Sequence, residues 1–437
     1  MDAVDEILYA WGPGENRLAL LARGRLCELA LERADLVAGA VFLGRVTEIA
    51  RGFDGAFVEI GRDRPGFLAG RAGLSQGDTV LVQVRADGAG GKGPILTRSV
   101  TVSGRWLALS LDRPGVSCSR KLPAPEQERL GALATAWCAE GEGLAVRTAA
   151  RGRTDEEMAA ELADLRTDMA AIAAGRAERR KPGLVWRPDM LARVLADNPA
   201  VTRVRVDDGA LAGRLKARFG DLVSHQRGDL LADVEEDMEA ALAPVVGLPS
   251  GGRLAIEPTA ALTAIDVDSG GGKAAEANRE AVGAIARHLR LRAIGGQVVV
   301  DFVSGGKGGM PALAAALKQA VAADPVPVHV YGATRLGLVE AVRERRGPSL
   351  AELMVESETR PTLAAAAFAA LRRAVADSDR RPGRALALVA APDLAGALRS
   401  RWGDAVAEAE ARIGRPLAIR TDAGRARDDV AILEDQG

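Results

Sequence analysis

The sequence ALTAIDVDSGGG, residues 261–272, has the pattern of a buried strand that ends in two aspartates and a glycine turn. A helix is predicted from about Ala274 to Arg292, and a second strand follows as QVVVDF, residues 297–302. A strand, a long helical crossover and another strand predict two neighbouring parallel strands in one sheet. We therefore expect an α/β layer in this part of the chain.

Three aspartates lie where these two strands end. Asp266 and Asp268 are two residues apart on one strand, so their side chains share a face. Asp301 ends the neighbouring strand, and ligand sites of parallel sheets lie beyond the carboxyl ends of the strands. Carboxylates that converge there suit Mg²⁺, which polarises a phosphodiester oxygen and activates water. The spacing leaves open the alternative that these aspartates only cap turns into the glycine loops.

Two other motifs are excluded by their spacing. The segment that starts at Asp266 begins like a calcium-binding loop, but its fifth position is Gly270 and its twelfth is Ala277. Lys273 and Lys307 end glycine-rich runs, but Ala and Gly follow them instead of Ser or Thr. A nucleotide-binding phosphate loop is therefore not expected.

Composition bounds the class of protein. With 437 residues, 48% hydrophobic and 27% charged, the chain fits a globular protein of about two to four domains. The formal net charge of −1 provides no global basic field, so any surface that binds nucleic acid must come from local arginine patches. The acidic N-terminus does not resemble a signal peptide, and no apolar run is long enough to cross a membrane. We expect a cytoplasmic protein without a membrane span.

Cysteine and histidine are too scattered for the sites that they usually build. Neither a disulfide framework, a zinc site nor a histidine-based triad fits their spacing. The cysteines and histidines of the chain are Cys27, Cys118, Cys138, His225, His288 and His329.

Periodicity divides the chain into successive regions. Strands are predicted in residues 1–36, short strands separated by glycines in 38–101, a helix from Thr154 to about Ala174, an α/β region in 182–250, and a β-α-α-β tail. Five short strands in the second region suggest a small barrel. Thr154 and Glu157 form a capping box. The acidic segment 376–381 is expected to be a linker before the first strand of the tail.

Two aromatic residues lie on neighbouring strands of the predicted barrel. Phe57 and Phe67 would serve as stacking platforms for unpaired bases if they are exposed. They would fill the core if they point inward, because small barrels also bury phenylalanine. The sequence leaves both interpretations open.

Three segments together resemble the catalytic part of the ribonuclease E/G family. They are ALTAIDVDSGGG, RHLRLRAIGGQVVVDFV (residues 287–303) and RLGLVEAVRER (residues 335–345). The resemblance implies a multidomain α+β fold with five parts. These are a split RNase H-like domain (1–36 and 182–252), an inserted OB-fold barrel that binds RNA (37–118), a 5′ sensor region (119–181), a DNase I-like catalytic α/β domain (253–350) and a small C-terminal β-α-α-β domain (351–437).

The resemblance also assigns roles to single residues. It implies that Asp266 and Asp301 are catalytic magnesium ligands and that Asp268 is a supporting catalytic group. It places RNA-binding residues in the barrel and a pair that grips a 5′-monophosphate in the sensor. The RNA-binding residues are Phe57, Phe67 and Lys92, and the sensor pair is Arg147 and Thr148.

The chain departs from the family pattern at three places. Ser304 stands where relatives usually have a further Asp, and Asp324-Pro-Val-Pro replaces a stretch that carries sensor arginines. The cysteines of the family's zinc-binding segment are missing after Met354, where the chain continues as VESETRPTL. We therefore expect no zinc, and a homo-oligomer, if one forms, without a zinc link.

The predicted function is that of a Mg²⁺-dependent endoribonuclease. It would hydrolyse single-stranded RNA in RNA processing or decay and leave 5′-phosphate and 3′-hydroxyl ends. The alternative is an RNA-binding protein of the same family with weak or lost catalysis, which Ser304 and the altered sensor suggest. A magnesium phosphohydrolase acting on small nucleotides is disfavoured because it leaves the barrel unexplained.

Overall fold

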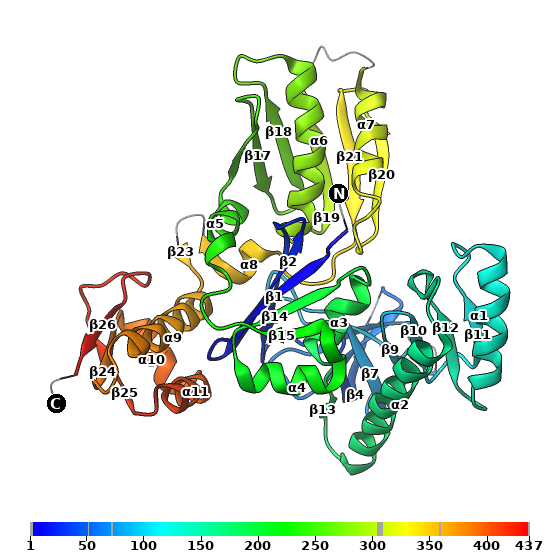
Figure 1. Ribbon diagram of the computed structural model, residues 1–437, viewed down its shortest axis with the longest axis horizontal. Helices are drawn as coiled ribbons and strands as arrows, with labels where there is room; N and C mark the ends of the chain where they lie inside the picture. The colour runs from blue at the N-terminus through cyan, green and yellow to red at the C-terminus, as the bar shows by residue number, and fades with distance from the viewer. Residues whose placement is uncertain (1–2, 51, 71–72, 304–308, 358–359, 436–437) are drawn as a thin grey trace. The chain divides into compact units, whose positions relative to one another are not determined.

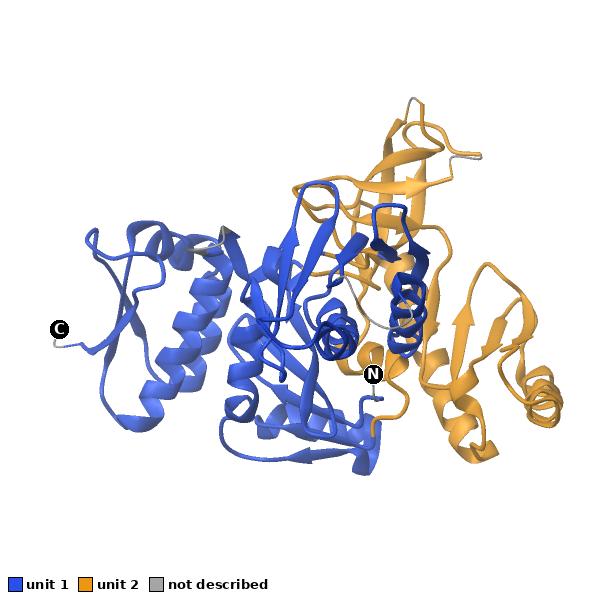
Figure 2. Ribbon diagram, turned by 90° about the horizontal axis from the view of Figure 1, so that it is seen from above, with its two compact units in different colours: residues 1–35, 202–344, 348–437 blue, residues 36–201, 345–347 orange. Residues whose placement is uncertain are grey.

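A computed structural model describes residues 3–50, 52–70, 73–303, 309–357 and 360–435. The fold is mixed α+β and divides into two compact units (Figure 2). Unit 1 comprises residues 1–35, 202–344 and 348–437, and unit 2 comprises residues 36–201 and 345–347. The five domain boundaries that the family resemblance implies stay a prediction.

Unit 2 contains a closed five-stranded barrel. Pairing of β4 with β7 closes the circle, and a further strand, β13 (Gly183–Trp186), pairs with the start of β4. Alternate side chains such as Val46, Val58 and Leu96 fill the interior. In order around the barrel, the strands are β4 (Val41–Ile49), β5 (Gly55–Glu59), β6 (Gly66–Ala69), β8 (Ile95–Thr97) and β7 (Thr79–Ala86).

A second sheet of unit 2 packs against two long helices. Its strands, in spatial order, are β11 (Gly115–Cys118), β12 (Gly143–Val146), β10 (Leu107–Ser110) and β9 (Thr101–Ser103). The helical segments are α1 (Ala124–Trp137), η1 (Thr148–Ala150), α2 (Asp155–Glu178) and α3 (Met190–Asp197). The predicted capping box is confirmed, because Thr154 accepts from the Glu157 N–H and Glu157 accepts from the Thr154 N–H.

The first sheet of unit 1 joins the N-terminal strands to a segment some 200 residues later. Strand β1 pairs in parallel with β14 on one side and antiparallel with β2 on the other. The strands, in spatial order, are β15 (Val223–His225), β14 (Arg203–Val206), β1 (Glu6–Ala10), β2 (Glu15–Ala22) and β3 (Arg25–Arg33). The helical segments that follow are α4 (Gly209–Phe219), η2 (Gly220–Leu222), η3 (Ala232–Val234) and α5 (Glu235–Leu242).

The second sheet of unit 1 contains the strands that end in aspartates. In spatial order its strands are β16 (Val245–Gly247), β17 (Arg253–Pro258), β18 (Thr263–Asp268), β19 (Gly296–Asp301), β21 (Leu338–Arg343) and β20 (Val328–Ala333). Helices α6 (Ala274–Leu291) and α7 (Gly309–Ala320) lie side by side on one face (Figure 1). The predicted parallel pairing of β18 with β19 is confirmed.

The C-terminal part of unit 1 contains the predicted β-α-α-β pattern and more. Its elements are α8 (Leu350–Met354), β22 (Val355–Ser357), β23 (Arg360–Pro361), α9 (Leu363–Arg380), β24 (Leu386–Ala390), α10 (Pro392–Ser400), α11 (Gly403–Ile413), β25 (Leu417–Thr421) and β26 (Ala431–Glu434). The prediction that segment 376–381 is a linker was wrong, because residues up to Arg380 form the end of α9. The helix extends to this polar last turn because its preceding turns are packed through an apolar stripe of buried residues, Phe368, Leu371 and Ala374.

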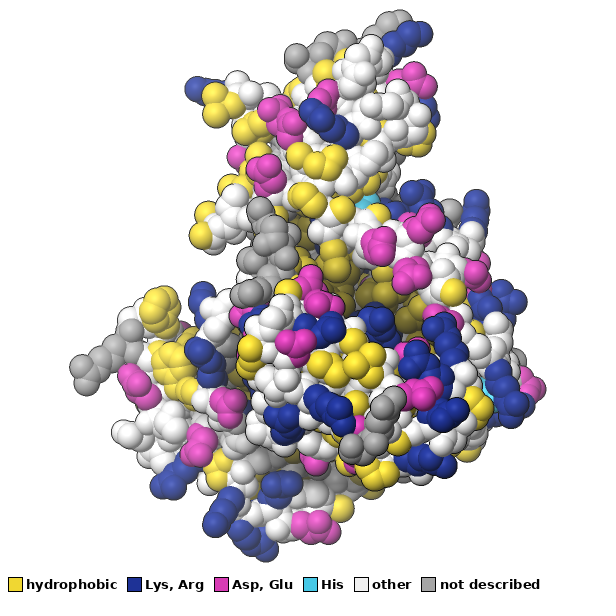
Figure 3. All heavy atoms as spheres, turned by 90° about the vertical axis from the view of Figure 1, so that its left-hand side faces the viewer, with side chains coloured by type: hydrophobic (Ala, Val, Ile, Leu, Met, Phe, Trp, Pro, Cys, Tyr) yellow, Lys and Arg dark blue, Asp and Glu magenta, His cyan; other side chains and the backbone are white. Residues whose placement is uncertain are grey.

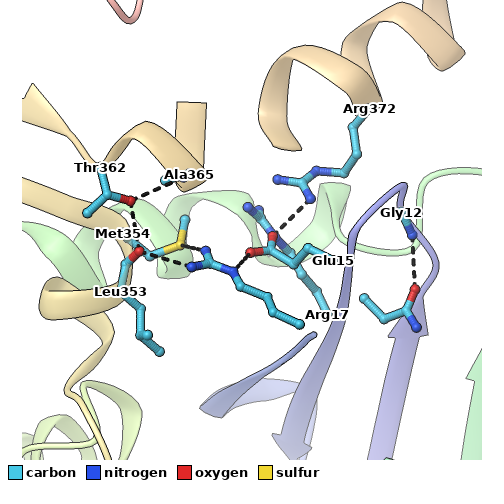
Figure 4. A network of polar contacts seen from close by, with 10 residues as sticks. Gly12, Glu15, Arg17, Leu353, Met354, Thr362, Ala365 and Arg372 are labelled. Atoms are coloured by element: carbon cyan, nitrogen blue, oxygen red, sulfur yellow. Dashed lines mark hydrogen bonds and ion pairs between the residues drawn. The ribbon is translucent and has the colours of Figure 1, made fainter. Parts of the chain in front are cut away.

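A buried ion cluster joins α9 to the first sheet of unit 1 (Figure 4). Glu15 is 1% exposed, and its carboxylate contacts the guanidinium groups of Arg17 (2.7 Å), Arg33 and Arg372 (2.9 Å). Arg33 also donates to the backbone oxygen of Leu353 at 3.2 Å. One carboxylate thus connects two strands to the C-terminal elements.

Candidate active site and RNA interface

The register of β18 and β19 places two predicted site residues side by side. Asp266 is the direct partner of Asp301 across the parallel pair, so their Cα atoms are about 4.8 Å apart by the spacing of paired strands. On both strands the alternate residues, such as Ile265 and Val300, are buried under the helices. The two carboxylates therefore share the open face of the sheet, and both are exposed.

Neither of these carboxylates forms an ion pair or hydrogen bond with another residue that the structure describes. Their oxygen atoms are available to a ligand. Within the same described part of the chain, no group of three or more His, Cys, Asp or Glu side chains could hold a metal ion. The candidate site therefore consists of a pair of carboxylates.

Asp268 lies on the same open face, but its carboxylate is already engaged. One oxygen accepts from the Gly270 N–H at 2.8 Å, and the other pairs with Arg253 of β17 at 2.8 Å. The hydrogen bond from Gly270 and the nearby guanidinium of Arg253 lower the pKa of Asp268. Asp268 therefore fixes the turn after β18 and is bound to protein groups instead of being free like Asp266.

The chain beyond Asp301 is held by a residue that the sequence did not single out. Asn278 of α6 is 1% exposed, and its amide nitrogen donates to the backbone oxygen of Val303 at 2.8 Å. Its amide oxygen accepts from the Val303 N–H at 3.0 Å. These two bonds fix the chain two residues past Asp301. The next residue, Ser304, and Lys307 lie outside the described residues.

In the barrel, Phe57 and Phe67 are direct cross-strand partners on β5 and β6. Their ring centroids are 5.7 Å apart in an edge-to-face arrangement, and neither ring belongs to the barrel core. Phe57 is 36% exposed and Phe67 is partly buried. A Cβ atom on Gly55 would lie 2.4 Å from the Phe67 ring, so this glycine makes room for the ring. Phe57 and Phe67 therefore lie outside the barrel core, and the alternative that they fill the core is wrong.

The aromatic pair continues into a third apolar side chain. Ile95 of β8 is the direct partner of Phe67 and is 41% exposed. Lys92, in the loop before β8, is exposed. The outer surface of the barrel thus presents an apolar row with a cationic side chain in the adjoining loop.

In the predicted sensor, Arg147 follows β12 and is held by backbone groups. Its Nη1 atom donates to the oxygens of Gly104 (2.5 Å) and Ala196 (2.6 Å). Thr148 is exposed, and its hydroxyl is 2.6 Å from the Ser119 hydroxyl. Arg147 therefore has a structural role through one nitrogen, and its other side-chain nitrogens form no hydrogen bond or ion pair with the residues that the structure describes.

An acidic residue near the predicted sensor has a structural role. Glu161 accepts from the N–H groups of Arg105, Trp106 and Leu107 at 2.7–2.8 Å and so holds the turn that contacts Arg147. The first turn of α2 is acidic, so this helix terminus offers little electrostatic support to a phosphate.

Asp324 belongs to the segment that replaces the sensor arginines of the family. Its buried carboxylate forms two bonds with Arg343, at 2.9 and 3.1 Å. This pair ties the segment before β20 to the end of β21. The replacement therefore contributes an internal ion pair to unit 1.

Charge is distributed without a dominant sign. The formal net charge is −1, and the face shown in Figure 3 carries both Lys and Arg and Asp and Glu side chains. Among the helices that the structure describes, none is long and apolar enough to cross a membrane.

A closed barrel with exposed aromatic rings and a sheet with a pair of free strand-end carboxylates define a multidomain α+β protein with features suited to a nucleic-acid ligand. The model of the Ribonuclease E/G family matches residues 101–346, which is more than half of the chain. The chain belongs to this family.

Curated relatives agree with this assignment. The chain is 28% identical to ribonuclease G of Salmonella typhimurium (strain SL1344), over 95% of this chain and 97% of the relative. It is 30% identical to ribonuclease G of Haemophilus influenzae, over 82% of each chain. It is 34% identical to ribonuclease E of Nostoc sp. (strain PCC 7120), over 77% of this chain, and spans 55% of that relative's length.

Proposed function

We propose that this protein is an endoribonuclease that hydrolyses single-stranded RNA in RNA processing or decay and leaves 5′-phosphate and 3′-hydroxyl ends. Membership of the Ribonuclease E/G family supports the class of reaction. The observation that carries the proposal is the pairing of Asp266 with Asp301, two free carboxylates in register on an open face.

The carboxylate pair fits Mg²⁺. This ion keeps several waters and takes one or two protein carboxylates, with substrate phosphate oxygens completing the shell, so a third acidic ligand is not required. When bound, the ion supplies polarisation of the phosphodiester and acidification of water. Asp266 and Asp301 would hold it, and Asn278 and Asp268 would keep the two strand ends in place.

The remaining parts have complementary roles in the proposal. We assign the barrel an OB-type role in which Phe57, Phe67 and Lys92 hold unpaired RNA. We assign Arg147 and Thr148 to a 5′-monophosphate, through the nitrogens of Arg147 that the backbone leaves free. The RNase H-like, DNase I-like and sensor domains with their boundaries, and the possible homo-oligomer without a zinc link, are part of the same proposal.

The decisive test replaces Asp301 by Asn. Cleavage of a fluorescent single-stranded RNA should nearly disappear while RNA binding persists, because the change removes a metal ligand's charge and leaves the aromatic row intact. Asp379→Asn is the matched control, since Asp379 is exposed on α9 and the change in charge is the same. Full activity of Asp301→Asn, or cleavage undiminished in EDTA, would overturn the assignment.

The wild-type result separates the two functions that the sequence left open. Cleavage that requires Mg²⁺ supports the endoribonuclease. Tight RNA binding by the wild-type protein without cleavage at any Mg²⁺ concentration supports an RNA-binding protein with lost catalysis.

A further inference from the structure

Strand β20 contains an irregularity on the open face of the sheet that bears Asp266 and Asp301. Its pairing with β21 shifts between Val330 and Gly332, so Tyr331 and Gly332 stand together opposite Glu340. Gly332 has φ +121°, a backbone conformation that favours glycine. Such a bulge redirects side chains, and bulges are frequent beside active sites.

The bulge directs Tyr331 away from the core. Val330 packs against the core under the helices, whereas Glu340 is exposed on the opposite face. Tyr331 is 71% exposed, which is unusual for a ring of this size. Because its ring makes little contact with the protein, a role in packing does not account for it.

Tyr331 lies close to the carboxylate pair. Strand β21 lies between β19 and β20, so the lateral separation is two strand spacings, or about 10 Å. Asp301 pairs with Leu338 and the bulge is opposite Glu340, two residues further along β21, which adds about 7 Å along the strand. The backbone positions are therefore about 12 Å apart, a distance that a few nucleotides of RNA cover at about 3.4 Å each when stacked.

The residues around Tyr331 determine which part of a nucleotide its ring contacts. An aromatic face stacks on any base, which suits a single strand of varied sequence. The exposed carboxylate of Glu340, opposite the bulge, repels phosphate oxygens. A base on the ring with its phosphates directed away from Glu340 satisfies both conditions.

We propose that Tyr331 forms a nucleotide subsite that stacks one base of single-stranded RNA within a few nucleotides of the scissile phosphate. The proposal rests on the proposed endoribonuclease function and adds a substrate contact within unit 1. This contact is separate from the Phe57 and Phe67 pair of the barrel in unit 2.

The test compares Tyr331→Ala with Tyr331→Phe and with Leu336→Ala. Leu336 is 86% exposed in the turn between β20 and β21 and provides a matched apolar truncation. Tyr331→Ala should raise KM for a single-stranded RNA about 5- to 150-fold, the equivalent of ~1–3 kcal/mol for one stack, while Tyr331→Phe and Leu336→Ala keep the wild-type value. The same factor should persist when Phe57 and Phe67 are both replaced by Ala, since the two contacts are made by different compact units and independent contacts act additively.

A binding experiment keeps this inference separate from the catalytic proposal. A series of RNAs, each with the fluorescent base 2-aminopurine at a different position, is bound to the Asp301→Asn protein. At one position stacking on Tyr331 should quench the fluorescence. The additional change Tyr331→Ala should abolish this quenching. If the wild-type protein cleaves RNA but Tyr331→Ala has wild-type KM and quenching, the subsite is refuted and the endoribonuclease stands. If no RNA is cleaved but quenching depends on Tyr331, the endoribonuclease fails and the base contact stands. A change in self-association alone would show the hairpin to be a protein interface and overturn the subsite.

Discussion

The ion cluster around Glu15 allows a stability prediction whose size follows from the structure. Burial alone would raise the pKa of Glu15, but the guanidinium groups of Arg17, Arg372 and Arg33 outweigh it and lower the pKa from 4.5 to about 2. At about 1.4 kcal/mol for each tenfold change, the folded protein favours the charged carboxylate by ~3 kcal/mol. Removing one partner of a buried ion pair typically costs ~3–5 kcal/mol, which agrees in size.

We therefore expect Glu15→Gln to destabilise the junction between α9 and the first sheet of unit 1 by ~3 kcal/mol. Because a chain with several domains need not unfold in one step, the measurement is native-state amide hydrogen exchange in α9 and β2. Glu434→Gln is the control, since the Glu434–Arg384 pair is exposed and its atoms are 3.9 Å apart. Such a surface pair contributes at most ~1 kcal/mol.

The pH dependence gives an independent check. The folded-state pKa of Glu15 lies below its unfolded value, so the carboxylate stabilises fully above about pH 4.5 and loses this contribution as the pH falls towards 2. The difference between wild type and Glu15→Gln should shrink over that range. Equal exchange rates in the two proteins at pH 7, or a difference that grows on acidification, would refute the reasoning.

Three further predictions concern RNA and assembly. Replacing Phe57 and Phe67 together by Ala should weaken RNA binding by ~1–3 kcal/mol per stack with little loss of stability, and wild-type binding with a lowered melting temperature would contradict this. The wild-type protein should cleave 5′-monophosphorylated RNA slightly faster than 5′-hydroxyl RNA, and Arg147→Ala should remove the difference; equal rates in the wild type would show a non-functional sensor. Elemental analysis should find no stoichiometric zinc, and light scattering should be the same before and after a chelator, whereas a dimer that splits on zinc removal would contradict the prediction.

The arrangement of the carboxylates was largely predictable from sequence. Apolar residues alternate with Asp266 and Asp268, and a helical period separates this strand from the one that ends in Asp301. These local patterns predict neighbouring parallel strands, but the residue-by-residue register depends on packing of the helices against both strands. The direct pairing of Asp266 with Asp301 therefore required the structure.

The orientation of the barrel aromatics had a usable signal in the sequence. In GAFVE, residues 55–59, Ala56 and Val58 alternate with Phe57 and Glu59, and the charged Glu59 marks the outward side. This alternation by itself favours the outward orientation of Phe57 over the core orientation. Phe57 is accordingly outward, next to Phe67.

Contacts between distant segments were beyond sequence reasoning. Glu15 and Arg372 are 357 residues apart, and nothing in either local pattern distinguishes a buried ion partner from an exposed charge. The β20 bulge also depends on its partner strand, because a residue is recognised as extra only when the register with β21 leaves it unpaired. Long-range pairing thus accounts for what local periodicity missed.

The open face of the sheet in unit 1 is itself an argument for a ligand. Parallel strands are usually covered on both faces, yet among the residues that the structure describes β18 and β19 are covered by helices, α6 and α7, on a single face. Free Asp266 and Asp301 occupy the uncovered face, and a bulge adds an exposed tyrosine to it. Two like charges in register repel each other, and an exposed ring forgoes burial, so neither feature stabilises the fold. A cation between the carboxylates and a base on the ring would relieve both costs, as the proposed metal site and the proposed nucleotide subsite require.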